Sequence, residues 1–331
     1  MVSLSIVVPV YNSQESIGEL ADALADVLPT LADAYELIMV EDDSRDDSWS
    51  AVQDITEKYD WATGIKFMRN YGQHNAILCG IRAAQYEVVA TMDDDLQHPP
   101  EELKKLLDKL DEGYDVVYGS PVEQPHGFLR GLASRTTKYF LQQTMSEEVA
   151  QHASAFRVLR TDLRQAFANY NEPTVIIDVL LTWATKRFAA VKVTHRPRPY
   201  GVSNYTVGKL INHAFSMMTG FSTVPLRFAS ILGLLMTIFG LILLFYVLII
   251  RLFFFGWEGE APGFTFLASM VAIFSGAQLF ALGIIGEYLA RMHFRLMNKP
   301  AYIVRMQTDS STRNEQPKIE SDYRTEETHA H

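Results

Sequence analysis

The stretch Glu87-Val88-Val89-Ala90-Thr91-Met92-Asp93-Asp94-Asp95-Leu96-Gln97-His98-Pro99-Pro100 places three consecutive carboxylates between an apolar run and a proline pair. The apolar run, residues 87–92, predicts a short buried strand, and the prolines predict the start of a helix over residues 101–112. Ligands of α/β proteins bind beyond the carboxyl ends of strands, where these carboxylates lie. The stretch therefore predicts a strand, a binding loop and a helix in succession.

Three units of the same kind precede this stretch. Strands are predicted at residues 4–10, 35–40 and 64–69, and each is followed by a polar loop and then by a helix, at residues 15–28, at residues 49–59 and up to residue 84. This alternation predicts an α/β fold with a largely parallel sheet. Residues 115–198 are less regular, with strands at 115–119 and 189–195 and a basic helical stretch at 129–142, and we expect them to form the acceptor side.

Two uncharged runs, residues 228–250 and 264–285, are each long enough to cross a hydrocarbon core, which takes about 20 residues. We expect two transmembrane helices, with burial inside a large soluble domain as the alternative. The amphipathic segment 206–221 is either a helix on the membrane surface or a globular helix. The chain thus divides into a head (1–205), a juxtamembrane helix (206–225), a membrane region (226–300) and a largely disordered tail (301–331).

Charges around the apolar runs predict the orientation. The segment 255–263 between the runs is acidic and carries no base, and Arg251 is expected to snorkel to the interface. The bases on the side of the two chain ends are Arg227, Arg291, Arg295 and Lys299. With no signal peptide expected at the N-terminus, the positive-inside rule places the head and the tail in the cytoplasm, at an inner membrane.

The overall composition excludes some classes of function. A formal net charge of −10 argues against a general nucleic-acid binder, so any phosphate must be held by local cations. The one cysteine, Cys79, excludes an internal disulfide and a cysteine-based zinc cluster.

The carboxylate triplet suits a divalent cation. Asp93 and Asp95, spaced i and i+2 at the strand end, can share one ion, which leaves Asp94 pointing elsewhere. Such a cation, Mg²⁺ or Mn²⁺, would neutralise the charge that a nucleotide diphosphate gains as it leaves. The alternative is an acidic helix entry in which an aspartate serves as the cap.

Several separated motifs resemble glycosyltransferase family 2, whose GT-A fold is a nucleotide-binding α/β sheet. They are Pro9-Val10-Tyr11-Asn12, the acidic loop 41–48 and the triplet, and the resemblance covers about residues 1–205. It implies that Asp93 and Asp95 bind the metal. It also implies a set of nucleotide-sugar contacts: Pro9, Tyr11, Glu15, Asp42 as acceptor from the base, Asp93, Gln97, and Arg198 and Ser203 in a closing segment. Asp43 stands where the family usually has glycine, which puts the conformation of that loop in question.

The segment 95–101 and the paired apolar runs look like dolichol-phosphate mannose synthases and bacterial polyprenyl-phosphate glycosyltransferases. This likeness implies inverting transfer of one sugar from a nucleotide diphosphate sugar, with UDP-glucose as the prior, to undecaprenyl phosphate for cell-envelope glycan modification. Arg130, Ser134 and Arg135, spaced to converge on one face of a helix, are the implied contacts to the acceptor phosphate. Glycines in both apolar runs would allow packing against further copies in a homo-oligomer.

The catalytic base is the least determined residue. Related bacterial enzymes have an aspartate before a Phe-Arg pair, but here Ala155 precedes Phe156-Arg157. Asp178, a lone carboxylate in an apolar stretch, is the candidate base, with a buried structural role as the alternative, and Asp94 is the second catalytic candidate. Two other functions stay open, namely transfer to another lipid-linked acceptor and a non-catalytic membrane scaffold that binds nucleotide sugars.

Overall fold

The computed structural model of the chain describes residues 2–121, 153–173, 175–196, 224–250, 264–297 and 299–308. Within them, eight strands form one sheet in the order β7-β5-β6-β4-β1-β2-β3-β8. The strands are β1 (Val2–Val10), β2 (Ala32–Glu41), β3 (Ala62–Phe67), β4 (Val88–Thr91), β5 (Val116–Pro121), β6 (Arg157–Arg160), β7 (Phe188–Val193) and β8 (Val304–Gln307). Strands β1 to β4 are mutually parallel, as are β5 and β7, whereas β6 and β8 run antiparallel to their neighbours. The predicted α/β fold with a largely parallel sheet is confirmed.

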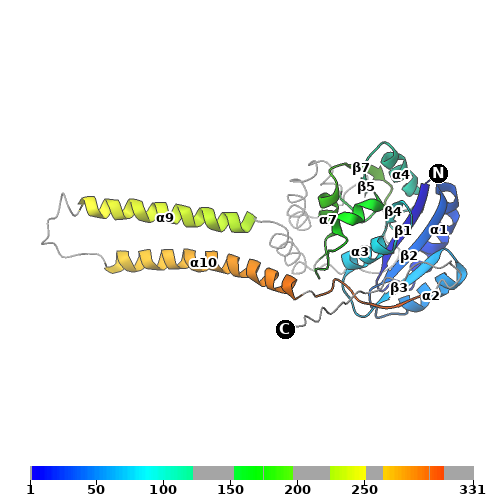
Figure 1. Ribbon diagram of the computed structural model, residues 1–331, viewed down its shortest axis with the longest axis horizontal. Coiled ribbons are helices and arrows are strands. Elements are labelled where there is room, and N and C mark those ends of the chain that lie inside the picture. Colours follow the sequence, from blue (N-terminus) through cyan, green and yellow to red (C-terminus); the bar gives the residue numbers. More distant parts are fainter. Residues whose placement is uncertain are drawn as a thin grey trace, which may run out of the picture.

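Helices cover both faces of this sheet (Figure 1). One face packs against α1 (Ile17–Leu31), α2 (Ser48–Lys58) and α4 (Leu103–Asp111), which a short 3-10 turn, η1 (Pro100–Glu102), precedes. The other face packs against α3 (Gln73–Ala83), η2 (Thr161–Phe167) and α7 (Ile177–Ala184). Because both faces are covered, the central strands are mostly apolar, and β1 is buried from Leu4 to Val10.

Helix α3 lies close against β1 at Gly80. A Cβ built on Gly80 would lie 2.2 Å from Cγ1 of Val7, so a side chain at this position would collide with the strand. The close approach places the first turn of α3 at the carboxyl end of β1, where polar loops from four strands meet.

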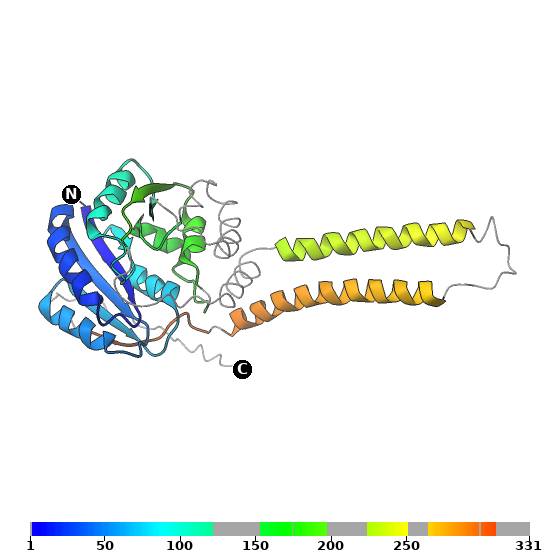
Figure 2. The same ribbon diagram turned by 180° about the vertical axis from the view of Figure 1, so that it is seen from behind.

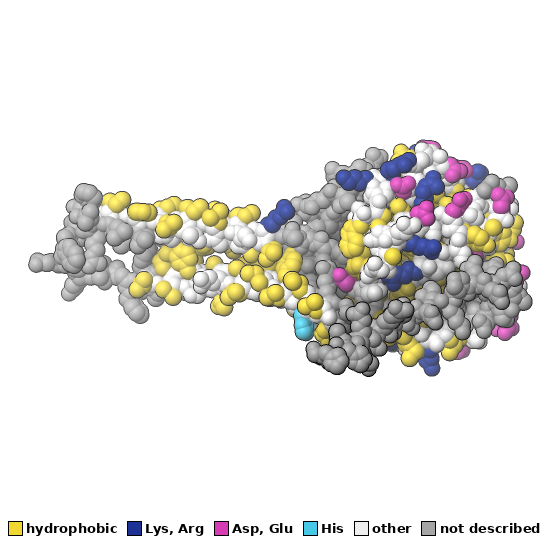
Figure 3. All heavy atoms as spheres, viewed as in Figure 1, with side chains coloured by type: hydrophobic (Ala, Val, Ile, Leu, Met, Phe, Trp, Pro, Cys, Tyr) yellow, Lys and Arg dark blue, Asp and Glu magenta, His cyan; other side chains and the backbone are white. Residues whose placement is uncertain are grey.

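Two long helices, α9 (Val224–Ile250) and α10 (Phe264–Leu296), lie side by side and project from the head (Figures 1 and 2). Their contact includes the rings of Phe228 and Phe280, whose centroids are 6.5 Å apart. Large apolar side chains are exposed along both helices, whereas charged side chains gather on the head (Figure 3). Of the described residues, only Ile273–Ala290 in α10 meets the length and composition of a membrane span, and α9 contributes a shorter apolar segment, Leu226–Ile242.

The end of the described chain departs from the sequence-based expectation. Residues 301–331 were assigned to a largely disordered tail, but Val304–Gln307 forms β8 and pairs with β3 at the edge of the sheet. Strand β8 is too short for periodicity to reveal, and its partner lies far upstream in the chain. The predicted juxtamembrane helix at 206–221 and the basic stretch at 129–142 lie outside the described residues.

Candidate functional site

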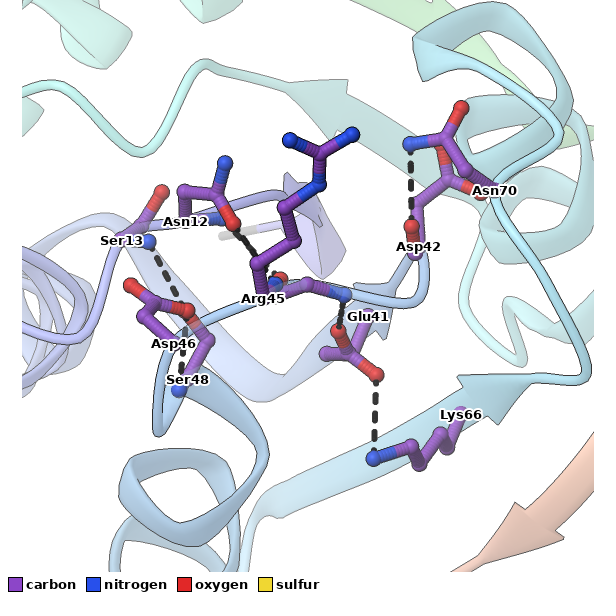
Figure 4. A network of polar contacts seen from close by, with 10 residues as sticks. Asn12, Ser13, Glu41, Asp42, Arg45, Asp46, Ser48, Lys66 and Asn70 are labelled. Atoms are coloured by element: carbon purple, nitrogen blue, oxygen red, sulfur yellow. Dashed lines mark hydrogen bonds and ion pairs between the residues drawn. The ribbon is translucent and has the colours of Figure 1, made fainter.

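Polar loops follow β1, β2, β3 and β4 at one edge of the sheet, because these adjacent strands are parallel. The loops after β1 and β2 are held together by hydrogen bonds in both directions (Figure 4). The backbone N–H of Asn12 donates to Oγ of Ser44 at 3.0 Å, and the backbone N–H of Arg45 donates to Oδ1 of Asn12 at 2.8 Å. The two loops therefore form one rigid wall of the site.

Left-handed backbone conformations shape this wall. Asn12 and Asp43 both have φ of 53°, a region that asparagine and aspartate enter more readily than other non-glycine residues. Asp43 thus takes the left-handed conformation that glycine adopts most easily. The loop therefore keeps a left-handed residue at this position, although aspartate replaces the usual glycine.

Glu41 supports the loop from beneath. Its side chain is buried, accepts a hydrogen bond from the backbone N–H of Ser44, and lies 3.6 Å from Nζ of Lys66 (Figure 4). Nζ of Lys66 also lies over the ring of Trp49, 5.4 Å from its centroid. A buried carboxylate needs such partners, so Glu41 ties the loop to β3.

Asp42 holds the loop after β3. Its two carboxylate oxygens accept hydrogen bonds from the backbone N–H of Tyr71 at 2.6 Å and of Gly72 at 2.7 Å. Burial, with smaller contributions from the neighbouring carboxylates of Glu41 and Asp43, nevertheless raises the pKa of Asp42 to about 6. A carboxylate has about four lone-pair sites, so these bonds leave room for the predicted contact to a nucleotide base.

The three carboxylates of the triplet point to different partners. Asp93 accepts a hydrogen bond from Nε2 of Gln73 at 2.6 Å, and Asp95 accepts one from the backbone N–H of Gln97 at 3.1 Å. Asp94 accepts from the backbone N–H of Tyr11 at 3.2 Å and from the hydroxyl of Ser13. Burial raises the pKa of Asp94. Asp94 therefore holds the loop after β1 in place. The sequence predicts Asp94 as a catalytic candidate, and these contacts suit a residue that positions the loop.

Two histidines beside the triplet were missed by the sequence reasoning. The ring of His98 stacks on Phe156 at 4.9 Å and meets the ring of His195 edge-on at 5.0 Å. Burial lowers the pKa of His98 to about 4, so its imidazole is neutral at pH 7. The backbone N–H of Arg196 donates to the carbonyl of Gln97 at 2.8 Å, which joins the end of β7 to the triplet loop. The local signal for His98 is its place in the segment 95–101, three residues after Asp95.

Asp178 lies at the start of α7 and forms an ion pair with the fully buried guanidinium of Arg157. The hydroxyl of Tyr118 also donates to Asp178, at 2.9 Å. A carboxylate that neutralises a buried arginine is needed to keep that charge inside the protein. These contacts are the ones expected if Asp178 has a buried structural role and is not the catalytic base.

Comparisons with known proteins bear on this arrangement. The family model described as glycosyl transferase family 2 matches residues 5–165. The undecaprenyl-phosphate 4-deoxy-4-formamido-L-arabinose transferase of Enterobacter sp. (strain 638) is 32% identical over 302 residues, which are 91% of this chain and 92% of the relative. The chain belongs to glycosyl transferase family 2. A protein of the same name from Pectobacterium atrosepticum is 32% identical over 94% of this chain and 95% of its own.

A solved structure shares the fold of this family 2 protein. Glucosyl-3-phosphoglycerate synthase from Mycobacterium tuberculosis, in complex with Mn²⁺, UDP and phosphoglyceric acid, superposes with a TM-score of 0.50 at 18% identity. The match covers 66% of this chain and 76% of that chain. The head therefore has the GT-A fold, and family membership makes the protein a glycosyltransferase.

Asp93 and Asp95 could hold a divalent cation in this family 2 site. Within the described part of the chain, no group of three or more His, Cys, Asp or Glu side chains forms a metal-binding cluster. Mg²⁺ is commonly held by only one or two carboxylates, with substrate phosphates and water as its other ligands. Two carboxylates at the edge of the donor site fit that pattern, so the residues present are compatible with the expected metal.

Of the remaining predicted site residues, only some lie in the described part of the chain. Pro9 is buried in β1, Glu15 is exposed, and Tyr11 is 39% exposed beside the triplet. The predicted contacts to the acceptor phosphate and in the closing segment lie outside the described residues: Arg130, Ser134, Arg135, Arg198 and Ser203. The structure thus brings together the donor-side residues of the prediction, namely Tyr11, Asp42 and the triplet.

Proposed function

We propose that the protein transfers a single sugar from a nucleotide diphosphate sugar to a polyprenyl phosphate at the cytoplasmic face of an inner membrane. The main support is the likeness to undecaprenyl-phosphate sugar transferases over 91% of the chain, which includes the helices outside the head as well as the head itself. The exposed apolar surface of α9 and α10 supports the membrane location, because an apolar surface of that size is stable in lipid and not in water.

The described residues would divide the donor site between them. Asp42 and the wall formed by the loops after β1 and β2 would bind the nucleoside, and Asp94 would hold that wall in place. Asp93 and Asp95 would hold Mg²⁺ or Mn²⁺, which neutralises the leaving diphosphate. UDP-glucose is the first donor to test, followed by dTDP and GDP sugars.

The acceptor places a modest demand on a catalytic base. A phosphate monoester is already anionic at neutral pH, so its attack requires positioning more than deprotonation. Arg130, Ser134 and Arg135 are proposed as its contacts, and Arg198 and Ser203 as contacts to the donor diphosphate. This mechanism is consistent with Asp178 being engaged by Arg157.

The test uses membranes that contain the full chain, supplied with undecaprenyl phosphate, a divalent cation and labelled UDP, dTDP or GDP sugars. We expect an extractable lipid that carries one sugar. Asp93→Ala and Asp95→Ala should abolish the product without lowering the amount of protein in the membrane, whereas Asp54→Ala, an exposed carboxylate on α2, should leave it unchanged.

Each alternative function gives its own result. No glycolipid with any donor would contradict the proposal. A product with more than one sugar, or formed only with a lipid-linked saccharide, would indicate another acceptor. Full biological activity in Asp93→Ala and Asp95→Ala would favour the non-catalytic scaffold.

A further inference from the structure

The segment that follows α10 returns to the head and runs beside β3 (Figures 1 and 2). Strand β8 extends the sheet, with Ile65 opposite Gln307 and Lys66 opposite Met306. The two ends of the pairing are fixed by further backbone bonds, from the N–H of Met68 to the carbonyl of Ile303 at 3.0 Å and from the N–H of Thr308 to the carbonyl of Gly64 at 2.9 Å. We name residues 301–308 the C-terminal clasp.

The side chain of Tyr302 packs against residues of the head. Its ring stacks on that of Phe67, with centroids 5.1 Å apart and planes 11° from parallel. The guanidinium of Arg82 lies over the Tyr302 ring, with its Cζ 5.8 Å from the ring centroid. Ala301, 2% exposed, accepts a hydrogen bond through its carbonyl from the side-chain amide of Asn75. The clasp therefore grips the end of β3 and the first turn of α3.

Residues 71–75, which lie next to the C-terminal clasp, also bind two donor-site carboxylates. Tyr71 meets Phe67 edge-on at 5.6 Å, and the backbone N–H groups of Tyr71 and Gly72 bind Asp42. One residue further, Gln73 donates to Asp93. Residues 70–75 thus contact Asp42 and Asp93 on one side and the C-terminal clasp, through Phe67 and Asn75, on the other.

We propose that Tyr302 is a positioning residue for the donor site, which acts through Phe67 on the loop whose residues contact Asp42 and Asp93. The catalytic part of this inference rests on the proposed function. Met68, Arg69 and Asn70 of this loop are exposed, so its position depends on the two backbone bonds to Asp42 and on the contact between Tyr71 and Phe67. The stacked pair of Tyr302 and Phe67 supplies a restraint from residues that follow the membrane region in sequence.

The proposal predicts a selective kinetic effect. Tyr302→Ala should raise KM for the nucleotide sugar about tenfold, because the donor must then order the loop as it binds. The turnover rate at saturating donor and KM for the lipid phosphate should change little, because the bound complex regains the same geometry. Tyr302→Phe keeps the stacked ring and should behave as the unaltered protein does.

A second readout does not depend on which donor the enzyme uses. Hydrogen–deuterium exchange of the full chain in lipid nanodiscs, without any ligand, should show faster exchange over residues 68–75 in Tyr302→Ala, with β1 and β2 unchanged. Tyr302→Leu, which keeps apolar volume, replaces the alanine variant if that variant does not fold. Ile303→Ala is the matched control, because this neighbouring side chain is 47% exposed.

The outcomes separate the inference from the proposed function. Unchanged exchange over residues 68–75 in a folded Tyr302 variant would overturn the positioning role. Faster exchange throughout the sheet, or equal losses in donor KM and turnover, would show a general structural role and would overturn it as well. Absence of glycolipid synthesis by the unaltered protein would refute the proposed function alone, since the exchange result stands without activity.

Discussion

Asp42 is the carboxylate for which the structure predicts a pH effect. Its pKa is raised from 3.8 to about 6, chiefly by burial. Between pH 3.8 and about 6, the carboxyl is therefore protonated in the folded protein and ionised in the unfolded chain. The associated stabilisation is present below about pH 4 and is lost as the pH rises through about 6. Asp42→Asn, which cannot titrate, should lack this dependence.

The measurement is the thermal midpoint of the full chain in detergent at several pH values between 4.5 and 7.5. Relative to Asp42→Asn, the unaltered protein should lose about 2 kcal/mol of unfolding free energy over this range, out of about 3 kcal/mol for the whole shift at about 1.4 kcal/mol for each pKa unit. An exposed carboxylate variant, Asp54→Asn, serves as the control for general effects of charge. Parallel pH profiles for Asp42→Asn and the unaltered protein would contradict the raised pKa.

Asp178 gives a second prediction, because a structural ion pair and a catalytic base respond differently to the same change. Asp178→Asn keeps an acceptor for Tyr118 but leaves the buried Arg157 charge without its partner. We expect a loss of about 3 kcal/mol of unfolding free energy, with the turnover rate of the folded fraction within about threefold of normal. Thermal unfolding and active-site titration measure the two quantities. A fall in turnover of a hundredfold or more at unchanged stability would instead identify Asp178 as the base.

The sequence predicted which residue types gather at the site better than it predicted their contacts. It separated Asp94 from Asp93 and Asp95 because alternate residues at a strand end point in different directions. The partner of Asp94 is Tyr11, 83 residues away, and the amides that bind Asp42 lie 29 and 30 residues downstream. Such pairings depend on how the strands are ordered in the sheet, which local patterns do not encode.

Two glycines in helices allow a matched test at the scale of elements. A Cβ on Gly80 of α3 would lie 2.2 Å from Val7, whereas a Cβ on Gly18 of α1 meets nothing within 4 Å. We expect Gly80→Ala to cost about 1–3 kcal/mol of unfolding free energy by forcing α3 away from β1. Gly18→Ala should add about 0.5–1 kcal/mol, because alanine is the better helix former. Thermal unfolding of both variants checks the pair, and destabilisation of equal size would argue against the close packing of α3.

Elements with strong local patterns were predictable, and those defined by distant partners were not. The alternating strands and helices up to α4 follow from apolar periodicity and proline placement. Strand β6 and helix α7 lie in an apolar region without clear periodicity, and β8 is stable only because β3 presents an edge to it. The short strands thus needed the tertiary structure for their identification.

At the scale of the whole molecule, one chain combines a charged head with an apolar pair of helices (Figure 3). The sequence predicted this division from the spread of charged residues alone. It did not predict that the chain after α10 returns to the sheet, because a four-residue strand leaves no pattern of its own. Because β8 joins the sheet, the chain belongs to the head both before and after the pair of helices in sequence.

The proposed membrane location leads to a prediction about two leucines of α10. Leu282 is 61% exposed within the apolar segment Ile273–Ala290, and Leu296 is 80% exposed where the helix ends beside the head. A lysine in the middle of a membrane span costs about 3 kcal/mol, whereas a lysine at its end extends to the interface at little cost. Leu282→Lys should therefore lower the fraction of protein that stays in membranes after an alkaline carbonate wash, and Leu296→Lys should not. Equal retention of both variants would mean that α10 does not cross the bilayer, since only a lipid core distinguishes two leucines that are both exposed.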